Sequence, residues 1–177
     1  MSIRKIVLAG VLGAIAIFLG VTRLGFIPVP TAAGNATIMH VPAIVGGIME
    51  GWPVGMIIGA IFGVFSFLQA TTPLFKDPLV AILPRLFIGV TAYFTYAALK
   101  KVTNEYISVI VAAVVGSMTN TILVLSMAAL RGYLSWSVAG SVAVVNGIPE
   151  AIVAAIVAVA VITAWKRIET GRGKAKV

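Results

Sequence analysis

Residues 37–70 have the sequence TIMHVPAIVGGIMEGWPVGMIIGAIFGVFSFLQA, and this stretch decides the fold. It is almost entirely apolar, which is typical of segments that cross a lipid bilayer. As one helix it would be about 50 Å long, far more than a single crossing of the hydrocarbon core needs. The break is expected at Glu50–Pro53, because glycine and proline interrupt helices. The stretch therefore predicts two membrane helices, at about 36–51 and 53–70.

The rest of the chain has the same character. It is 60% hydrophobic and only 10% charged, and its mean hydropathy is +1.12, whereas soluble domains average about 25% charged residues. No clear small-residue cleavage site follows the first apolar block, so we expect that block to be retained as a helix. The fold class predicted is an all-α membrane protein, a six-transmembrane-helix bundle that forms a single domain over residues 1–177. The four remaining helices are expected at about 6–21, 79–99, 106–130 and 137–165, followed by a basic cytoplasmic tail at 166–177.

The distribution of positive charge predicts the orientation. Nine of the thirteen Lys and Arg residues would lie on the side that holds both termini and the turns after the second and fourth helices. Three would lie on the other side: Arg23, Lys76 and Arg131. Because cytoplasmic loops carry the excess of Lys and Arg, both termini are expected in the cytoplasm.

Small residues at four-residue spacing predict close helix packing, because they let two backbones approach each other. They recur along one face of the third helix and as two overlapping pairs in the first helix. They are Gly51, Gly55, Gly59 and Gly63 in the third helix, and Ala9 with Gly13 and Gly10 with Ala14 in the first.

Polar side chains inside these helices are the candidate binding residues. An ionisable residue at the centre of a membrane helix costs roughly 2.5–3.5 kcal/mol, so it usually faces a partner or a cavity. Depth along the helices predicts that four of them meet at an outward-facing pocket: Arg85, Asn146, Gln69 and His40. Arginine suits a carboxylate ligand, because its planar fork grips two oxygens.

Each assignment has an alternative. Arg85 could instead form a buried structural pair with Glu150, and His40 could simply be a polar residue at a helix start. Asn120 and Thr121 could bind ligand or hold helices together through hydrogen bonds. The loop aromatics, Phe26 and Phe75 among them, could cover an apolar ligand or belong to an interfacial aromatic belt.

The residue inventory argues against an enzyme. The chain has no Cys, one His and five acidic residues, which leaves little for a metal centre or a catalytic triad. It has no phosphate-binding glycine loop with the required spacing and no Gly-x-Ser-x-Gly motif. We therefore expect no catalytic residue, no metal and no cofactor, and no direct use of ATP.

The order of several short motifs resembles the substrate-binding S components of prokaryotic energy-coupling factor (ECF) vitamin transporters. The motifs run along nearly the whole chain: Thr37–Gly47 (TIMHVPAIVGG), Phe65–Gln69 (FSFLQ), Leu83–Gly89 (LPRLFIG), Thr119–Thr121 (TNT) and Asn146–Glu150 (NGIPE). The resemblance implies a plasma-membrane subunit that captures a water-soluble vitamin at its outer face. It also implies partners, namely a transmembrane coupling (T) component and two ATPase subunits.

The resemblance carries over to particular residues. It places Arg85, Asn120, Asn146 and the loop residues at the vitamin site. It places the small residues of the first helix on the docking surface for the T component. The family usually has Ala-x-x-x-Ala there, and this chain has Ala9/Gly13 and Gly10/Ala14 instead, so both registers stay open.

A vitamin with a carboxylate is expected because of Arg85, pantothenate first and folate second. Riboflavin ranks lower because it has no carboxylate. Two other classes stay open: a stand-alone proton-coupled transporter that uses Glu150, and a structural subunit without a ligand.

Overall fold

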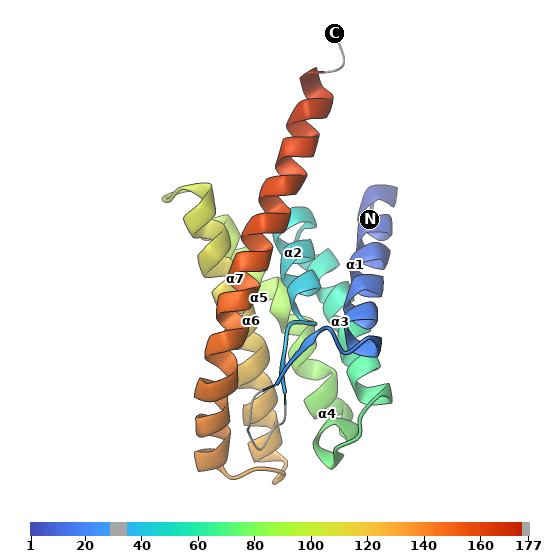
Figure 1. Cartoon of the computed structure of the whole chain (residues 1–177), viewed down its shortest axis with the longest axis vertical. Coiled ribbons are helices and arrows are strands. Elements are labelled where there is room, and N and C mark those ends of the chain that lie inside the picture. The colour runs from blue at the N-terminus through green and yellow to red at the C-terminus, as the bar shows by residue number, and fades with distance from the viewer. Residues whose placement is uncertain (29–34, 175–177) are drawn as a thin grey trace.

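The computed structural model describes residues 1–28 and 35–174, with side chains as far as residue 168. It shows a bundle of helices along one axis, with the N-terminus and the end of the last helix at the same end (Figure 1). The expected all-α class is confirmed, with one small two-stranded ribbon in addition. The elements are α1 (Ile3–Val21), β1 (Phe26–Ile27), β2 (Ala36–Thr37), α2 (Val41–Glu50), α3 (Trp52–Leu68), the 3-10 helix η1 (Pro73–Lys76), α4 (Pro78–Ala81), α5 (Leu83–Leu99), α6 (Glu105–Leu130) and α7 (Trp136–Lys174).

Helix length separates full crossings from shorter helices. Four stretches are long and apolar enough to cross a bilayer: Ile3–Val21, Pro78–Leu99, Glu105–Leu130 and Trp136–Ile168. α3 has 17 residues and is about 26 Å long. α2 has only 10 residues, about 15 Å, which is half of a hydrocarbon core.

The predicted start of the second helix at residue 36 is therefore wrong. Ala36 and Thr37 pair antiparallel with Ile27 and Phe26, and the chain enters α2 only at Val41. Pro42 lies in the first turn of α2, where its missing N–H leaves no helical bond unmade. The preceding residues form the short strand β2 and a turn beside the bundle core, below α2 in Figure 1.

The predicted helix at 79–99 is one span in two pieces, α4 and α5, which meet at Ile82. Pro84 causes the break, because it has no N–H to donate to the carbonyl of Val80 four residues earlier. At the other end of the chain, α7 begins at Trp136 and continues to Lys174, well beyond residue 165. Most of the predicted tail is thus an extension of the last helix.

The glycine face of α3 packs backbone to backbone against α5. A β-carbon at Gly59 would lie 2.1 Å from the carbonyl oxygen of Arg85, and one at Gly55 would lie 2.7 Å from the Cα of Gly89. Gly51 has another task, because its φ of 103° forms the turn between α2 and α3. The prediction of close approach is confirmed for Gly55 and Gly59, and this contact fixes where Arg85 lies.

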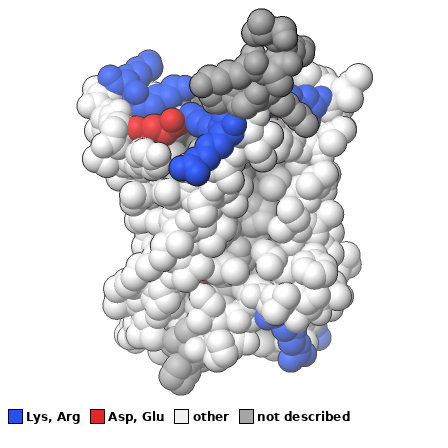
Figure 2. Space-filling view, turned by 45° about the horizontal axis from the view of Figure 1, so that its top comes forward, with Lys and Arg blue, Asp and Glu red and all other residues white. Residues whose placement is uncertain are grey.

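On the face shown in Figure 2, the exposed charged residues gather at the two ends of the bundle, with an uncharged surface between them. At the end with the chain terminus, Arg4 lies 2.9 Å from Glu50, and Lys166 pairs with Glu105. A belt without charge is the surface that a hydrocarbon core requires, since an exposed charge there is costly.

Candidate ligand-binding site

A cavity of about 300 Å³ lies in the half of the bundle that is far from the chain terminus. Its walls come from the last turns of α3, from η1, from the start of α5, from the second half of α6, from the first half of α7, and from the β1 and β2 segments. Six of the seven residues predicted for the pocket line this cavity: Arg85, Asn120, Asn146, Gln69, Phe75 and Phe26.

Arg85 is the positive charge of the cavity, and the Pro84 break positions it. Nη1 of Arg85 donates to the carbonyl oxygen of Val80, the acceptor that Pro84 leaves open. The guanidinium carbon lies 5.5 Å from the centre of the Phe62 ring and 5.1 Å from that of Phe75, distances at which a cation is attracted to a ring face. The residue is only 3% exposed, and its Nε has no hydrogen-bond partner among the described residues.

Glu150 is the negative charge of the same cavity, and it does not pair with Arg85 within 4.0 Å. One carboxylate oxygen accepts from the backbone N–H of Thr37 at 2.6 Å, and the other accepts from the hydroxyl of Thr121 at 3.0 Å. Glu150 thus joins α7 to β2 and to α6. The structure therefore does not contain the direct Arg85–Glu150 ion pair that was the alternative prediction.

The two asparagines extend the polar lining. Asn120 of α6 and Asn146 of α7 are each 5% exposed, and both face the cavity. Oδ1 of Asn120 has no hydrogen-bond partner within the described part of the chain. Thr121 holds helices together through Glu150, whereas its neighbour Asn120 offers an open acceptor to whatever occupies the cavity.

The remaining lining is largely apolar. Leu74 and Phe75 of η1, Phe62 of α3 and Phe26 of β1 surround the polar groups. Such a combination of apolar walls with a few convergent polar atoms is typical of small-molecule sites. The aromatic residues Phe26 and Phe75 therefore belong to the cavity wall, as one of the two interpretations of the sequence predicted.

His40 does not line the cavity, so its assignment to the pocket is corrected. It is fully buried at the start of α2, and its Nε2 lies 3.0 Å from the hydroxyl of Ser117 in α6. The prediction assumed that the second helix begins at the membrane surface. Because α2 begins inside the bundle, His40 begins there too, and its place at a helix start is what the alternative interpretation expected.

Several lining residues were not predicted. Glu150 was considered only as a partner of Arg85 or as a proton site, and it lines the cavity as well. Thr121, for which ligand binding and helix contact were both left open, also lines it. Thr37 and Met39 line the cavity because residues 36–40 form a short strand and a turn in place of a helix, which periodicity does not reveal. Among the side chains of residues 1–28 and 35–168, no cluster of three metal-ligating groups is present.

The small residues of α1 divide between two faces. Ala9 and Gly13 are buried, and a β-carbon at Gly13 would lie 2.7 Å from Cδ1 of Ile61 in α3. Gly10 and Ala14 are exposed, and a β-carbon at Gly10 would meet no atom within 4 Å. The two overlapping pairs therefore have different roles: the first packs α1 against the bundle, and the second is on the outer surface.

Comparison with known proteins gives consistent results. Residues 4–162 match the family described as ECF transporter, substrate-specific component. The chain is 33% identical to the pantothenic acid transporter PanT of Lactococcus lactis subsp. cremoris (strain MG1363), over 72% of this chain and 76% of that one.

Two solved structures have the same fold. ThiT from Listeria monocytogenes has a TM-score of 0.62 and 14% identity, with 87% of this chain and 92% of that chain covered. A structure described as the S component of a bacterial ECF transporter has a TM-score of 0.65 and 18% identity, with 94% and 96% covered. With a family match over residues 4–162 and a membrane bundle of the same fold, this chain belongs to the substrate-specific components of ECF transporters and is a multi-pass membrane protein.

Proposed function

We propose that this chain captures pantothenate in the cavity between α3, α5, α6 and α7. The observation that carries the proposal is Arg85, a buried cation whose Nε lacks an acceptor and whose guanidinium lines the cavity. A buried arginine pairs best with a carboxylate, which matches its planar fork. The family is one of transport proteins, so the bound vitamin is cargo and no reaction is performed on it.

Size and chemistry favour pantothenate over folate. The cavity of about 300 Å³ is at the small end of the range of ligand pockets, about 300–1,000 Å³. Folate is much larger than pantothenate, because it carries a pteridine ring, an aminobenzoyl group and a glutamate. The relative from Lactococcus lactis is named for pantothenic acid, which agrees with this choice.

The polar groups of the cavity suggest one orientation of the ligand. Its carboxylate would lie at Arg85, where Phe62 and Phe75 exclude water and strengthen the attraction. Its hydroxyl and amide groups would face Asn120 and Asn146, which can accept and donate hydrogen bonds. Glu150 lies in the same wall and would repel a carboxylate placed beside it, so the reverse orientation is disfavoured.

Titration calorimetry on the purified protein tests the proposal, with pantothenate, folate, riboflavin and thiamine as ligands. We expect pantothenate to bind most tightly, and mass spectrometry of freshly purified protein to find it as the co-purifying vitamin. If none of the four binds and no vitamin co-purifies, the assignment of the cavity to vitamin capture is wrong. If folate binds best, only the choice of vitamin is wrong.

We also propose that both termini lie in the cytoplasm and that the cavity opens to the outside. The end of the bundle with Arg4, Lys5 and the last turns of α7 is the more basic one, in line with the excess of Lys and Arg in cytoplasmic loops. Because the chain has no cysteine, single introduced cysteines report their side cleanly. Ser2→Cys should be labelled by a membrane-impermeant maleimide only in opened cells, and Lys76→Cys also in intact cells.

For the coupling partners, the outer face of α1 is the proposed docking surface. Gly10 and Ala14 leave a small, exposed patch that another helix backbone can approach closely. Ala14→Leu should prevent co-purification with the T component and the two ATPases and leave pantothenate binding unchanged. Val144→Leu, an exposed residue of α7, is the matched control and should keep both.

A stand-alone proton-coupled transporter is not favoured by the geometry. Both oxygens of Glu150 accept hydrogen bonds, from Thr37 and Thr121, which gives this acid a structural task. Pantothenate uptake into proteoliposomes should require the coupling module and ATP. Uptake by this chain alone, abolished in Glu150→Gln, would support the alternative.

A further inference from the structure

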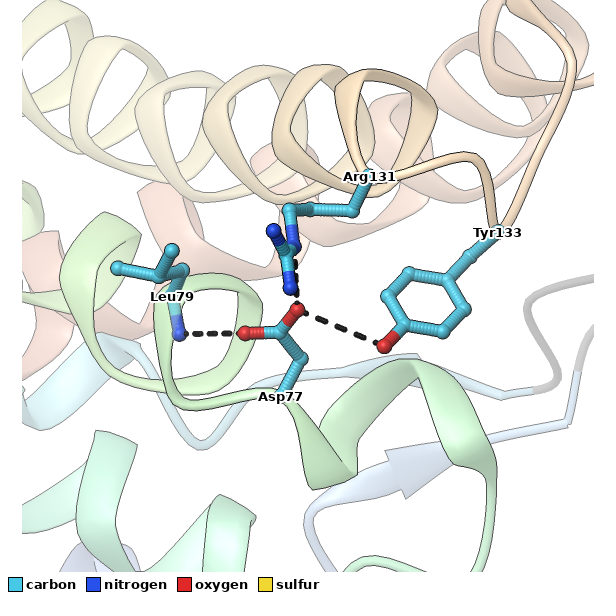
Figure 3. A network of polar contacts seen from close by, with 4 residues as sticks. All are labelled: Asp77, Leu79, Arg131 and Tyr133. Atoms are coloured by element: carbon cyan, nitrogen blue, oxygen red, sulfur yellow. Dashed lines mark hydrogen bonds and ion pairs between the residues drawn. The ribbon is translucent and has the colours of Figure 1, made fainter.

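Asp77 connects two loops at the far end of the bundle (Figure 3). Its Oδ1 accepts from the backbone N–H of Leu79 at 3.0 Å and so caps α4. Its Oδ2 accepts from Nε of Arg131 at 2.6 Å and from the hydroxyl of Tyr133 at 3.4 Å. One carboxylate therefore joins the η1–α4 loop to the α6–α7 turn.

The segment held by Asp77 is a wall of the cavity. η1 ends at Lys76, directly before Asp77, and it contributes Leu74 and Phe75 to the lining. Phe75 also covers the guanidinium of Arg85. Any outward movement of η1 would open the cavity on this side and remove a ring from the arginine that we propose to bind the carboxylate.

The anchor on the other loop is rigid. Gly132, with φ of 78°, follows the last residues of α6, and its N–H bonds to the carbonyl of Ala129. The N–H of Tyr133 bonds to the carbonyl of Ala128. This is the hydrogen-bond pattern of a Schellman motif, which fixes the backbone that carries Arg131. Arg131 can thus hold η1 without moving itself.

Apolar packing also holds η1, but it leaves room for movement. Leu74 and Phe75 are partly buried and pack against a small cluster formed by Val80, Val124 and Ala128. The main core, around Ile44, Ile58 and Ile88, lies elsewhere in the bundle. The ion pair therefore adds a second attachment to this packing of η1.

We propose that the Asp77–Arg131 pair is a latch on the η1 wall, and that its opening sets how long the ligand stays in the cavity. Asp77 acts as a positioning residue, because it works through Leu74 and Phe75 and does not line the cavity itself. The inference rests on the proposed capture of a small molecule in this cavity. It adds that dissociation, more than association, depends on this pair.

Asp77→Asn is the decisive variant. Asparagine caps a helix as well as aspartate does, so α4 keeps its start, while the charge of the latch is lost. The dissociation rate of radiolabelled pantothenate, chased with excess unlabelled vitamin, should rise about fivefold, the factor that corresponds to one partly exposed ion pair. Arg131→Gln should give the same increase from the other side, and Tyr133→Phe should leave the rate nearly unchanged.

Salt distinguishes a latch from a general structural role. In the wild type, dissociation should accelerate between low and high ionic strength, because Arg131 is half exposed and its attraction is screened. In Asp77→Asn the rate should be high and independent of salt. A variant that binds pantothenate with the wild-type dissociation rate, or with the wild-type salt dependence, would overturn the latch.

A measurement without ligand keeps the latch testable by itself. Spin labels on Lys76→Cys and Ser137→Cys, both exposed, report the distance between η1 and the start of α7. The distance distribution should be narrow in the parent and broader in Asp77→Asn. Failure of the wild type to bind any vitamin would remove the proposed function, and an unchanged distribution would remove the latch.

Discussion

Replacing Arg85 by glutamine removes the only positive charge that lines the cavity, within the described residues. Nη1 of the guanidinium donates a hydrogen bond to the carbonyl oxygen of Val80, whereas Nε has no acceptor among the described residues. Glutamine has similar length but neither the charge nor the fork. The matched change in the ligand is pantothenol, in which an alcohol replaces the carboxylate of pantothenate.

The magnitude follows from the contacts. Each hydrogen bond to a charged group contributes about 1.5–3 kcal/mol, and a carboxylate left in a dry site after loss of its partner costs more than a neutral group. We therefore expect Arg85→Gln to weaken pantothenate binding by about 3 kcal/mol, which is about 150-fold in Kd. The pantothenate affinity of Arg85→Lys should lie between those of the wild type and Arg85→Gln, because lysine keeps the charge and loses the planar fork.

Titration calorimetry on two proteins (wild type and Arg85→Gln) with two ligands (pantothenate and pantothenol) measures the interaction between Arg85 and the carboxylate. The wild type should prefer pantothenate to pantothenol strongly, and Arg85→Gln should bind both about equally weakly. Because the loss of Arg85 also leaves the Val80 carbonyl unpaired, the variant should unfold at a lower temperature. The ratio between the two ligands is insensitive to that loss. A variant that still prefers pantothenate would show that its carboxylate lies elsewhere.

Three further outcomes follow from the structure. Gly59→Ala should lower the free energy of unfolding by roughly 1–3 kcal/mol and weaken pantothenate binding, because its β-carbon would lie 2.1 Å from the Arg85 carbonyl oxygen and push α5 away. Gly10→Ala is the control: its β-carbon would meet no atom within 4 Å, so it should change neither the unfolding free energy nor pantothenate binding. Glu150→Gln should lower the unfolding free energy by about 1–2 kcal/mol, since two hydrogen bonds lose their charge, as followed by chemical unfolding in detergent. Arg131 and Tyr133 hold the pKa of Asp77 below its ordinary value, so the latch is complete above about pH 4 and is lost as the pH falls through the folded-state pKa. The rate of pantothenate dissociation should therefore be constant from about pH 5 to 8 and rise only in stronger acid. A rise of this rate near neutral pH would contradict the assignment.

The features that the sequence predicted are the ones written in local patterns. Apolar blocks of membrane length gave the helices, and glycines at four-residue spacing gave the α3–α5 contact at Gly55 and Gly59. Depth along the helices predicted that Arg85 and Asn146 share one pocket, and the family resemblance added Asn120. The structure places all three on one cavity.

The errors have long-range causes. The start of the second helix depends on the pairing of Thr37 with Phe26 and on a hydrogen bond from Thr37 to Glu150. These partners are far apart along the chain, so no local periodicity reports them. The misplacement of His40 follows directly, since it was located by assuming a full-length helix. Similarly, α7 continues beyond its apolar block, where the Lys, Arg and Glu residues of the extension have high helix propensity.

The short α2 also explains why a buried acid lies in the cavity that we propose binds a carboxylate. Replacing the first turns of a membrane helix by extended chain makes room for a ligand, but it leaves backbone N–H groups inside the bundle, where each must find a partner. The N–H of Ile38 bonds to Gly25, that of Met39 to the Thr37 side chain, and that of Thr37 to Glu150. Glu150 thus holds the cavity wall, because each of its carboxylate oxygens accepts a hydrogen bond from that wall, from Thr37 or from Thr121. Arg85 retains an open donor and Asn120 an open acceptor, so the polar groups divide into those that build the cavity and those left for its ligand.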